Sequence, residues 1–330
     1  MTMSQVVRFH ELGGPGVLRL EQRSVPEAAD GEVLIEVQAI GLNRADKMFR
    51  MGQYLEKAQL PSMLGFEAVG MIAALGPSVQ GFAVGDMVGV LPGFELGRYG
   101  TYAEHALIPA THLVPQPAGL SAVEGAGLWM AYLTAYGGLV EAGGLGKGDW
   151  IAITAASSSV GLAAIQVARQ VGARPIAVTL TSTKRDALLA AGAEAVISTS
   201  DEPLESRLRE LAPYGIQCAF DAVGGPQVNQ LAGAMAKRGT IVVHGALSPD
   251  ATPFPLKLAL KRSLSVRGFV YTEVTEDAAA LQRVRTFISA GIEAGILRPL
   301  VDRVFSLSDV VAAHEYLESN QQFGKIVMTV

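Results

Sequence analysis

A turn of small residues lies in the middle of the chain, between a strand-like apolar run and a helix-like apolar run. The run Trp150–Thr154 leads into the segment Ala155-Ala-Ser-Ser-Ser-Val-Gly161. Small side chains allow an anion to approach the backbone, and the N–H groups at a helix start point toward it. This pattern is typical of a turn that binds a dinucleotide pyrophosphate, although an ordinary strand-to-helix turn looks similar and only the last glycine of G-x-G-x-x-G is present. The candidate ligands are Ser158, Ser159, Val160 and Gly161.

The next strand-like run ends near Thr179, where NAD-binding folds often place an Asp or Glu that holds the ribose 2′-hydroxyl. This chain has Thr179-Leu-Thr-Ser-Thr-Lys-Arg185 instead. Without a carboxylate a 2′-phosphate is not repelled, and hydroxyl and cationic groups can bind it. The segment therefore predicts NADPH, with Thr179, Ser182, Lys184 and Arg185 as candidate ligands and Lys184 the strongest of them. The alternative is that Lys184 and Arg185 form the exposed first turn of the next helix.

The elements that must position these residues alternate between strand and helix after Gly148. The expected strands are Trp150–Thr154, Pro175–Leu180, Ala195–Ser198, Gln217–Asp221, Thr240–Gly245 and Ser265–Val270. The expected helices between them are Val160–Val171, Lys184–Ala191, Leu204–Leu211 and Val228–Lys237. This alternation indicates an α/β fold with a doubly wound parallel sheet.

The chain before residue 121 has a different character, with short β-like runs separated by Gly and Pro. These runs are Val33–Ala39, Ala68–Leu75, Met87–Leu91 and Tyr102–Ile108, and they predict an irregular β-rich domain. Ser121-Ala-Val-Glu124 is a capping-box pattern, which predicts a helix from there to about Val140.

Composition narrows the classes of function. The 330 residues carry a formal net charge of -5, which disfavours nucleic acid or an anionic membrane surface as the main partner. There is one cysteine, Cys218, so no intrachain disulfide can form. The apolar runs are too short to span a bilayer, and the first residues have no apolar signal core. We therefore expect a soluble, cytoplasmic protein.

Further motifs carry a resemblance to a known family. They are Gly41-Leu-Asn-Arg-Ala-Asp46 with Gly52-Gln-Tyr54, Pro61–Gly70 with the pattern P-x3-G-x-E-x2-G, the turn Ala155–Gly161, Asp221–Gly225 and Phe323–Val327. With these motifs the whole chain resembles the zinc-independent quinone oxidoreductases of the medium-chain dehydrogenase/reductase superfamily. The resemblance implies a GroES-like β-rich catalytic domain, residues 1–122 and 266–330, around an inserted Rossmann domain, residues 123–265. It also implies a homodimer.

The resemblance implies further residues beside the cofactor. Thr134 should touch its phosphate or nicotinamide side, and His244 and Gly245 should flank the nicotinamide. Phe269 and Val270 should border the same pocket, although both could equally be core residues. Gly324 or Lys325 could reach the cofactor from the tail.

The resemblance also predicts that no metal takes part. Zinc-dependent alcohol dehydrogenases of the superfamily have a Cys where Asn43 stands and a His where Phe66 stands. An open catalytic zinc site needs about three protein ligands, and Asn and Phe are not useful ones. The five histidines show no ligand spacing. Without a Lewis acid, alcohol oxidation is disfavoured.

Reduction of a conjugated acceptor is easier without a metal. Hydride addition gives an enolate or hydroquinone anion, which requires only hydrogen bonds and a proton. Asn43 could donate its amide N–H to the acceptor oxygen, and Tyr54 could bind the same oxygen or supply the proton. The alternatives are that Asn43 serves a loop turn and that Tyr54 is a rim residue.

The leading hypothesis is NADPH-dependent hydride transfer to a small electrophile, either a quinone or an α,β-unsaturated carbonyl. A 2-enoyl thioester reductase is the first alternative. An NADPH-binding redox sensor with little turnover is the second alternative, and it belongs to a different functional class.

Overall fold

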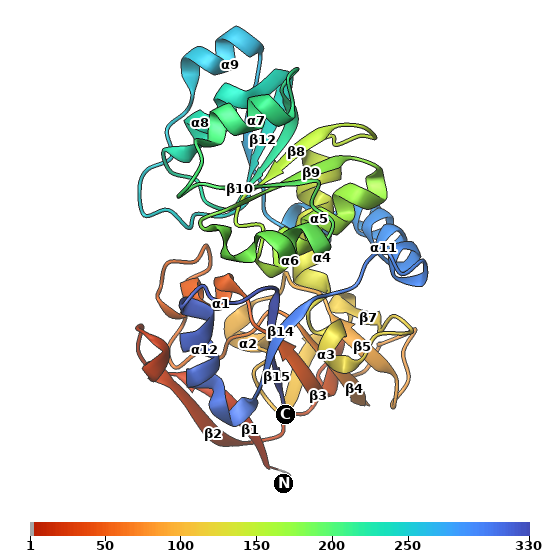
Figure 1. Cartoon of the computed structure of the whole chain (residues 1–330). Helices are drawn as coiled ribbons and strands as arrows, with labels where there is room; N and C mark the ends of the chain where they lie inside the picture. Colours follow the sequence, from red (N-terminus) through yellow and green to blue (C-terminus); the bar gives the residue numbers. More distant parts are fainter. Residues whose placement is uncertain (1–2) are drawn as a thin grey trace. The chain divides into compact units, whose positions relative to one another are not determined.

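The chain folds into two compact units, which a computed structural model describes for residues 3–330 (Figure 1). The first unit contains the residues up to Met130 together with Arg298–Val330, and the second contains Ala131–Leu297. The second unit is therefore an insertion into the first. No helix within residues 3–330 is both long and apolar enough to cross a bilayer.

The second unit is built on a six-stranded parallel sheet with the order β10-β9-β8-β11-β12-β13. Its strands are β8 (Trp150–Ile153), β9 (Arg174–Thr179), β10 (Ala195–Ser198), β11 (Ile216–Asp221), β12 (Met235–Val243) and β13 (Ser265–Gly268). Starting from β8, the chain first builds outward to β10 and then returns to place β11 on the other side of β8. This is the doubly wound order of dinucleotide-binding folds, with its topological switch point between β8 and β11.

The helices of this unit connect the strands and cover the sheet. They are α5 (Ser159–Val171), α6 (Arg185–Ala190), α7 (Leu204–Leu211), α8 (Gln227–Ala234), α9 (Leu256–Arg262), α10 (Thr272–Thr275) and α11 (Ala278–Glu293). The apolar faces of α7 and α8 pack on the sheet through Leu208 and Leu231. Gly172 ends α5 in the left-handed conformation, φ 86, which glycine adopts without a steric penalty. The predicted α/β class is confirmed.

The described part of the first unit is mostly β-sheet. One sheet has the order β14-β15-β3-β4-β5-β7, with β6 also paired to β3, and β1 and β2 form a separate hairpin. The strands are β1 (Met3–Phe9), β2 (Leu18–Ser24), β3 (Glu32–Gly41), β4 (Ala68–Leu75), β5 (Met87–Val90), β6 (His105–Pro109), β7 (Leu113–Pro115), β14 (Val301–Ser306) and β15 (Lys325–Thr329). Its helices include α1 (Arg44–Arg50), α2 (Leu96–Tyr99), α3 (Ala122–Gly125) and α12 (Val310–Glu318). Because β15 pairs with β3, the end of the chain completes this sheet.

The helix expected from Ser121 to Val140 is interrupted in the structure. Ser121 and Glu124 do form the expected capping box, but α3 ends at Gly125 and a new helix, α4, runs from Trp129 to Tyr136 before a π-helical segment, Gly137–Ala142. Between α3 and α4 the N–H groups of Gly127 and Leu128 bond three residues back, to Glu124 and Gly125. Such i→i+3 bonds tighten the chain and separate the two helices.

The units differ from the expected domain boundaries, mainly at residues 266–297. These residues were expected in the catalytic domain, but they belong to the second unit. β13 pairs with β12 along its length, and the amide of Gln170 in α5 donates to the Phe287 carbonyl of α11 at 3.0 Å. Strand pairing and helix packing therefore keep this segment with the parallel sheet until Arg298.

Candidate cofactor-binding and catalytic sites

The turn between β8 and α5 forms a cradle of backbone groups. Ala155 has φ 46, a left-handed conformation that is uncommon for a residue with a side chain. Ser158 caps α5, because its Oγ accepts a hydrogen bond from the Gly161 N–H at 3.0 Å. A Cβ on Gly161 would lie 2.6 Å from the Ala156 carbonyl oxygen, so only glycine fits there. The N–H groups of Ser159 and Val160 belong to the first helical turn, where they have no acceptor within the helix and are suited to an anion.

Lys184 lies beside this turn in the second unit. Its Nζ donates to the Ser157 Oγ at 3.3 Å, across the end of β9. The cation expected to bind a 2′-phosphate is therefore next to the expected pyrophosphate site. Ser157 was missed by the sequence analysis, although its place in the run of three serines could have suggested it.

The other residues at the end of β9 have partners of their own. The Arg185 guanidinium donates to the Val196 carbonyl at 2.8 Å and forms an ion pair with Glu202. Arg185 is thus committed to holding α6 and β10 together, and the alternative of a structural role fits it better than phosphate binding. The carbonyl of Thr179 accepts from the Thr199 N–H at 2.9 Å.

Ser182 lies near a carboxylate that the sequence analysis did not consider. Hydrogen bonds from Ser198, Ser200 and Ser182 lower the pKa of the Asp201 carboxyl. A negative charge beside Ser182 makes this serine a weaker candidate for phosphate binding than Lys184. Among the candidates for binding the 2′-phosphate, Lys184 and its neighbour Ser157 are therefore the strongest.

Buried hydrogen bonds connect β8 and β11 at the topological switch point of the sheet. The Thr154 hydroxyl donates to Asp221 Oδ1 at 2.8 Å, and the same carboxylate accepts from the N–H groups of Val223 and Gly224 at 3.0 and 3.1 Å. Asp221 has no exposed surface. These hydrogen bonds hold together the carboxyl ends of β8 and β11, where doubly wound sheets bind their ligands.

His244 follows β12 and stacks on Phe220, with ring centroids 3.8 Å apart and an interplanar angle of 17°. Burial lowers the pKa of His244 to about 3, so the imidazole is neutral at physiological pH and does not act as a protonated acid. The next residue, Gly245, approaches the Ala222 carbonyl so closely that a Cβ would lie 2.7 Å from its oxygen.

Three further expected cofactor residues lie in the second unit. Phe269 is buried, and a Cβ on Gly137 would overlap its ring edge, which agrees with the packing alternative. Val270 is half-buried, and Thr134 is buried in the middle of α4.

In the first unit, Asn43 is enclosed by a buried charge cluster. Its Nδ2 donates to the Gly41 carbonyl at 3.2 Å and to Glu67 Oε1 at 3.0 Å, and its Oδ1 accepts from Lys325 Nζ at 2.8 Å. Both amide hydrogens therefore have protein acceptors. In this arrangement, donation to a substrate oxygen would require Asn43 to give up or share one of these bonds.

Glu67 lies at the centre of the same cluster. It forms a buried ion pair with Lys325, and its Oε2 accepts from the Met130 N–H at 2.9 Å, at the start of α4. The Lys325 ammonium group is thus turned inward rather than toward solvent. Gly324, before it, has φ 109 and packs against Leu300.

Asp46 is buried in the first turn of α1, which begins directly after Asn43. The Asn43 N–H donates to its Oδ2 at 2.8 Å, so Asp46 supports the local backbone. Burial raises the pKa of Asp46 to about 7, against the opposing effects of this hydrogen bond and of Lys325.

Tyr54 lies on the loop after α1 and is half-buried. Its ring meets the ring of Phe66 edge to face, with centroids 5.3 Å apart and an interplanar angle of 77°. Phe66 is buried. Tyr54 is therefore held against Phe66 by an apolar contact.

The residues of this cluster do not fit a zinc ion. An aromatic ring stands at one expected ligand position, the Asn43 carbonyl faces an ammonium group, and Glu67 is neutralised by Lys325. Within residues 3–330, no group of three His, Cys, Asp or Glu side chains is arranged to hold a metal ion. A cation of the protein thus takes the place beside Glu67 that a metal would need.

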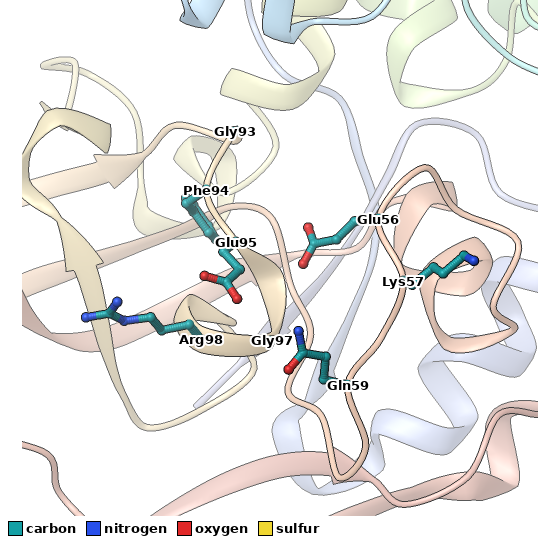
Figure 2. Close-up of a pocket in the computed structure, with 8 residues that line it drawn as sticks. All are labelled: Glu56, Lys57, Gln59, Gly93, Phe94, Glu95, Gly97 and Arg98. Carbon is teal, nitrogen blue, oxygen red and sulfur yellow. The ribbon is translucent and has the colours of Figure 1, made fainter.

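A separate cavity of about 460 Å³ lies between two loops of the first unit (Figure 2). Its lining residues are Glu56, Lys57, Gln59, Gly93, Phe94, Glu95, Gly97 and Arg98. The Glu56 carboxylate holds the second loop by accepting from the Leu96 N–H at 3.1 Å, and burial raises the pKa of Glu56. None of the expected site residues lines this cavity.

Comparison with known proteins extends the resemblance over both units. A family profile described as an alcohol dehydrogenase GroES-like domain matches residues 29–118, and one described as a zinc-binding dehydrogenase matches residues 159–286. The quinone oxidoreductase of Lama guanicoe is 28% identical over 99% of this chain and 97% of the relative. Prostaglandin reductase-3 of Bos taurus is 30% identical over 92% of this chain and 82% of the relative.

Solved structures agree with this assignment. The Escherichia coli quinone oxidoreductase complexed with NADPH matches with a TM-score of 0.91 and 28% identity, over 99% of this chain and 100% of that one. A structure described as an NAD-dependent alcohol dehydrogenase matches with a TM-score of 0.90 and 31% identity, over 99% of both chains. The chain therefore belongs to the medium-chain dehydrogenase/reductase superfamily, with quinone oxidoreductases among its relatives, and it is an oxidoreductase with a GroES-like domain and a dinucleotide-binding domain.

Proposed function

We propose that the protein reduces a quinone or an α,β-unsaturated carbonyl with NADPH. The observation that carries the proposal is the contact of Lys184 with Ser157 beside the phosphate turn, at the end of a β9 strand without a carboxylate. A lysine there offers a 2′-phosphate a charge partner that NADH does not need. The NADPH complex of a relative supports the same choice, whereas the match to an NAD-dependent relative means that the family alone does not decide it.

NADPH supplies the hydride when it is bound. The first turn of α5 binds its pyrophosphate through the N–H groups of Ser159 and Val160, and Lys184 and Ser157 bind the 2′-phosphate. The neutral His244 and the neighbouring Gly245 flank the nicotinamide, and Thr134 and Val270 complete its surroundings. These residues orient the cofactor and exclude water, which is the main contribution a protein makes to hydride transfer.

The reaction proceeds without a metal. The support is the pairing of Glu67 with Lys325 and the presence of Asn43 and Phe66 at the positions where zinc-dependent relatives have ligands. Without a Lewis acid, the acceptor must be one whose reduction gives a stabilised anion, such as an enolate or a hydroquinone anion. The names of the relatives, quinone oxidoreductase and prostaglandin reductase, agree with this class of acceptor.

Tyr54 donates the proton to the reduced acceptor, directly or through water. The loop after α1 presents its ring beside Phe66, and a phenol, with an ordinary pKa of about 10, suits an acid better than a base. Asn43 has no free amide hydrogen and is assigned a positioning role instead.

The protein acts in the cytoplasm as a homodimer. The edge strand β13 and the exposed apolar residues around α9, namely Leu247, Phe254, Leu256 and Leu260, provide a surface that a second copy can cover. Sedimentation of the purified protein tests the dimer.

The test of the reaction is oxidation of reduced nicotinamide, followed by absorbance. The purified protein is mixed with NADPH or NADH and with 1,4-benzoquinone, 9,10-phenanthrenequinone, a simple enone or crotonyl-CoA, with and without a chelator. Rapid oxidation of NADPH but not NADH, insensitive to the chelator, is expected. A preference for NADH would contradict the role of Lys184, and loss of activity to the chelator would contradict the metal-free reaction.

A further inference from the structure

Lys325 is a buried lysine whose ammonium group contacts only other protein groups in the cluster around Glu67. Its side chain is 1% exposed, and it is one of the largest fully buried side chains among the described residues. Burying an ammonium group is costly unless it is paired and hydrogen-bonded. Both conditions are met, by the Glu67 carboxylate and the Asn43 Oδ1.

The ammonium group determines how the Asn43 amide is turned. Because an ammonium group only donates hydrogen bonds, the amide oxygen must face Lys325. The amide nitrogen then faces Glu67 and the Gly41 carbonyl, at 3.0 and 3.2 Å. Without Lys325, the amide would lose the partner that holds its oxygen in place.

Glu67 connects the cluster to the start of α4. One of its oxygens faces Lys325 and Asn43, and the other accepts from the Met130 N–H. A carboxylate is favourable at a helix start, where the N–H groups carry partial positive charge. Met130 lies one helical turn before Thr134 on α4, so the first turn of the helix that carries Thr134 is tied to the cluster.

We propose that Lys325 is a positioning residue. Its ammonium group holds the Asn43 amide and the Glu67 carboxylate in one orientation, and through Glu67 it holds the first turn of α4. The inference rests on the proposed function only in taking Thr134, on that helix, as a contact of NADPH.

The test compares three variants: Lys325→Met, Glu67→Gln and the double variant. Lys325→Met removes the charge while keeping most of the side-chain volume, and it leaves Glu67 buried without its cation. The double variant removes the uncompensated charge, which buried sites tolerate poorly. The amide that Glu67→Gln introduces can still accept from the Met130 N–H, and its nitrogen can donate to the Asn43 Oδ1 in place of Lys325. Lys47→Met is the matched control, because Lys47 pairs with Glu318 at 3.2 Å in the same unit but its side chain is only partly buried.

One readout does not depend on the cofactor. The chain has two tryptophans, and Trp129 lies buried in the first turn of α4. In a Trp150→Phe background, the emission of Trp129 reports on that turn. We expect Lys325→Met to shift this emission, the double variant to restore most of it and Lys47→Met to leave it unchanged.

The second readout is the dissociation constant of NADPH. We expect Lys325→Met to raise it about tenfold, within the range of coupled buried neighbours, and the double variant to recover most of this loss. The KM for NADPH should rise with the dissociation constant, and the KM for the acceptor should change less.

Different results would contradict the proposed function and the proposed role of Lys325. If the wild-type protein binds no NADPH, the proposed function fails, and the Trp129 emission still decides the role of Lys325. The role of Lys325 is overturned if Lys325→Met shifts the emission no more than Lys47→Met, or if the double variant is no better than Lys325→Met. Should Lys325→Met not fold, recovery of folding in the double variant supports the proposal, and continued failure overturns it.

Discussion

The phosphate turn of the second unit and the Lys325 cluster of the first unit consist of different kinds of chemical group. The turn is one continuous segment, Ala155–Gly161, and it offers mainly backbone N–H groups. The cluster joins Asn43, Glu67 and Lys325, and its ion pair connects residues 258 positions apart in the chain. A backbone cradle depends on local conformation, whereas a buried charge cluster depends on every member being present. We therefore expect the two regions to respond to mutation in different ways.

The largest effect is expected at the cluster. Glu67→Ala leaves the Lys325 ammonium group buried without a counter-charge, and we expect a loss of about 3–5 kcal/mol in the free energy of unfolding. Denaturation in guanidinium chloride measures it. Glu194→Ala is the control, because its ion pair with Arg174 is largely exposed and should contribute little. Equal losses in the two variants would remove the distinction between a buried cluster and ordinary surface pairs.

The next effect concerns pH. The pKa of Asp46 is raised to about 7 by burial, so the folded protein holds this proton more tightly than the unfolded chain does. The stabilisation is complete below the ordinary pKa of about 4 and is lost as the pH rises to about 7, at roughly 1 kcal/mol per pH unit. Asp46→Asn stays neutral. The unfolding free energy of the wild type should therefore fall relative to this variant between about pH 4 and pH 7, and parallel profiles would contradict a raised pKa of Asp46.

A smaller and more selective effect is expected at the phosphate turn. Lys184→Ala removes a charged hydrogen-bond donor, and we expect the affinity for NADPH to fall by about 1.5–3 kcal/mol while NADH binding changes little. Titration calorimetry with both cofactors measures the two affinities. An equal loss for NADH would mean that Lys184 acts on the turn itself rather than on a 2′-phosphate.

The smallest effect is expected at the neighbouring arginine. Arg185→Gln should change the NADPH dissociation constant by no more than about twofold, because Arg185 is committed to Glu202 and the Val196 carbonyl. The same titration checks it beside Lys184→Ala. A loss as large as that of Lys184→Ala would restore Arg185 to the phosphate site.

Much of the second unit followed from local patterns. Ala195–Ser198 and Leu204–Leu211 were predicted with the bounds that the structure has, because short apolar strands and an amphipathic helix are specified by neighbouring residues. The helix after Ser121 was predicted too long. Its cap was readable, but the helix ends at Gly125, where the side chain of Gln116 packs against the chain.

The fold class could be predicted from the sequence, and the turn Ala155–Gly161 and Lys184 could be proposed from it as candidate ligands. These features depend on residues close together in the chain, where spacing and side-chain type limit the conformations available. The partners of Arg185 and of the Asn43 amide, and the inward direction of Lys325 toward Glu67, became visible in the folded chain alone. Their partners are brought together by the packing of segments far apart in the chain, and a hydrogen bond that a side chain has already formed cannot be read from its type.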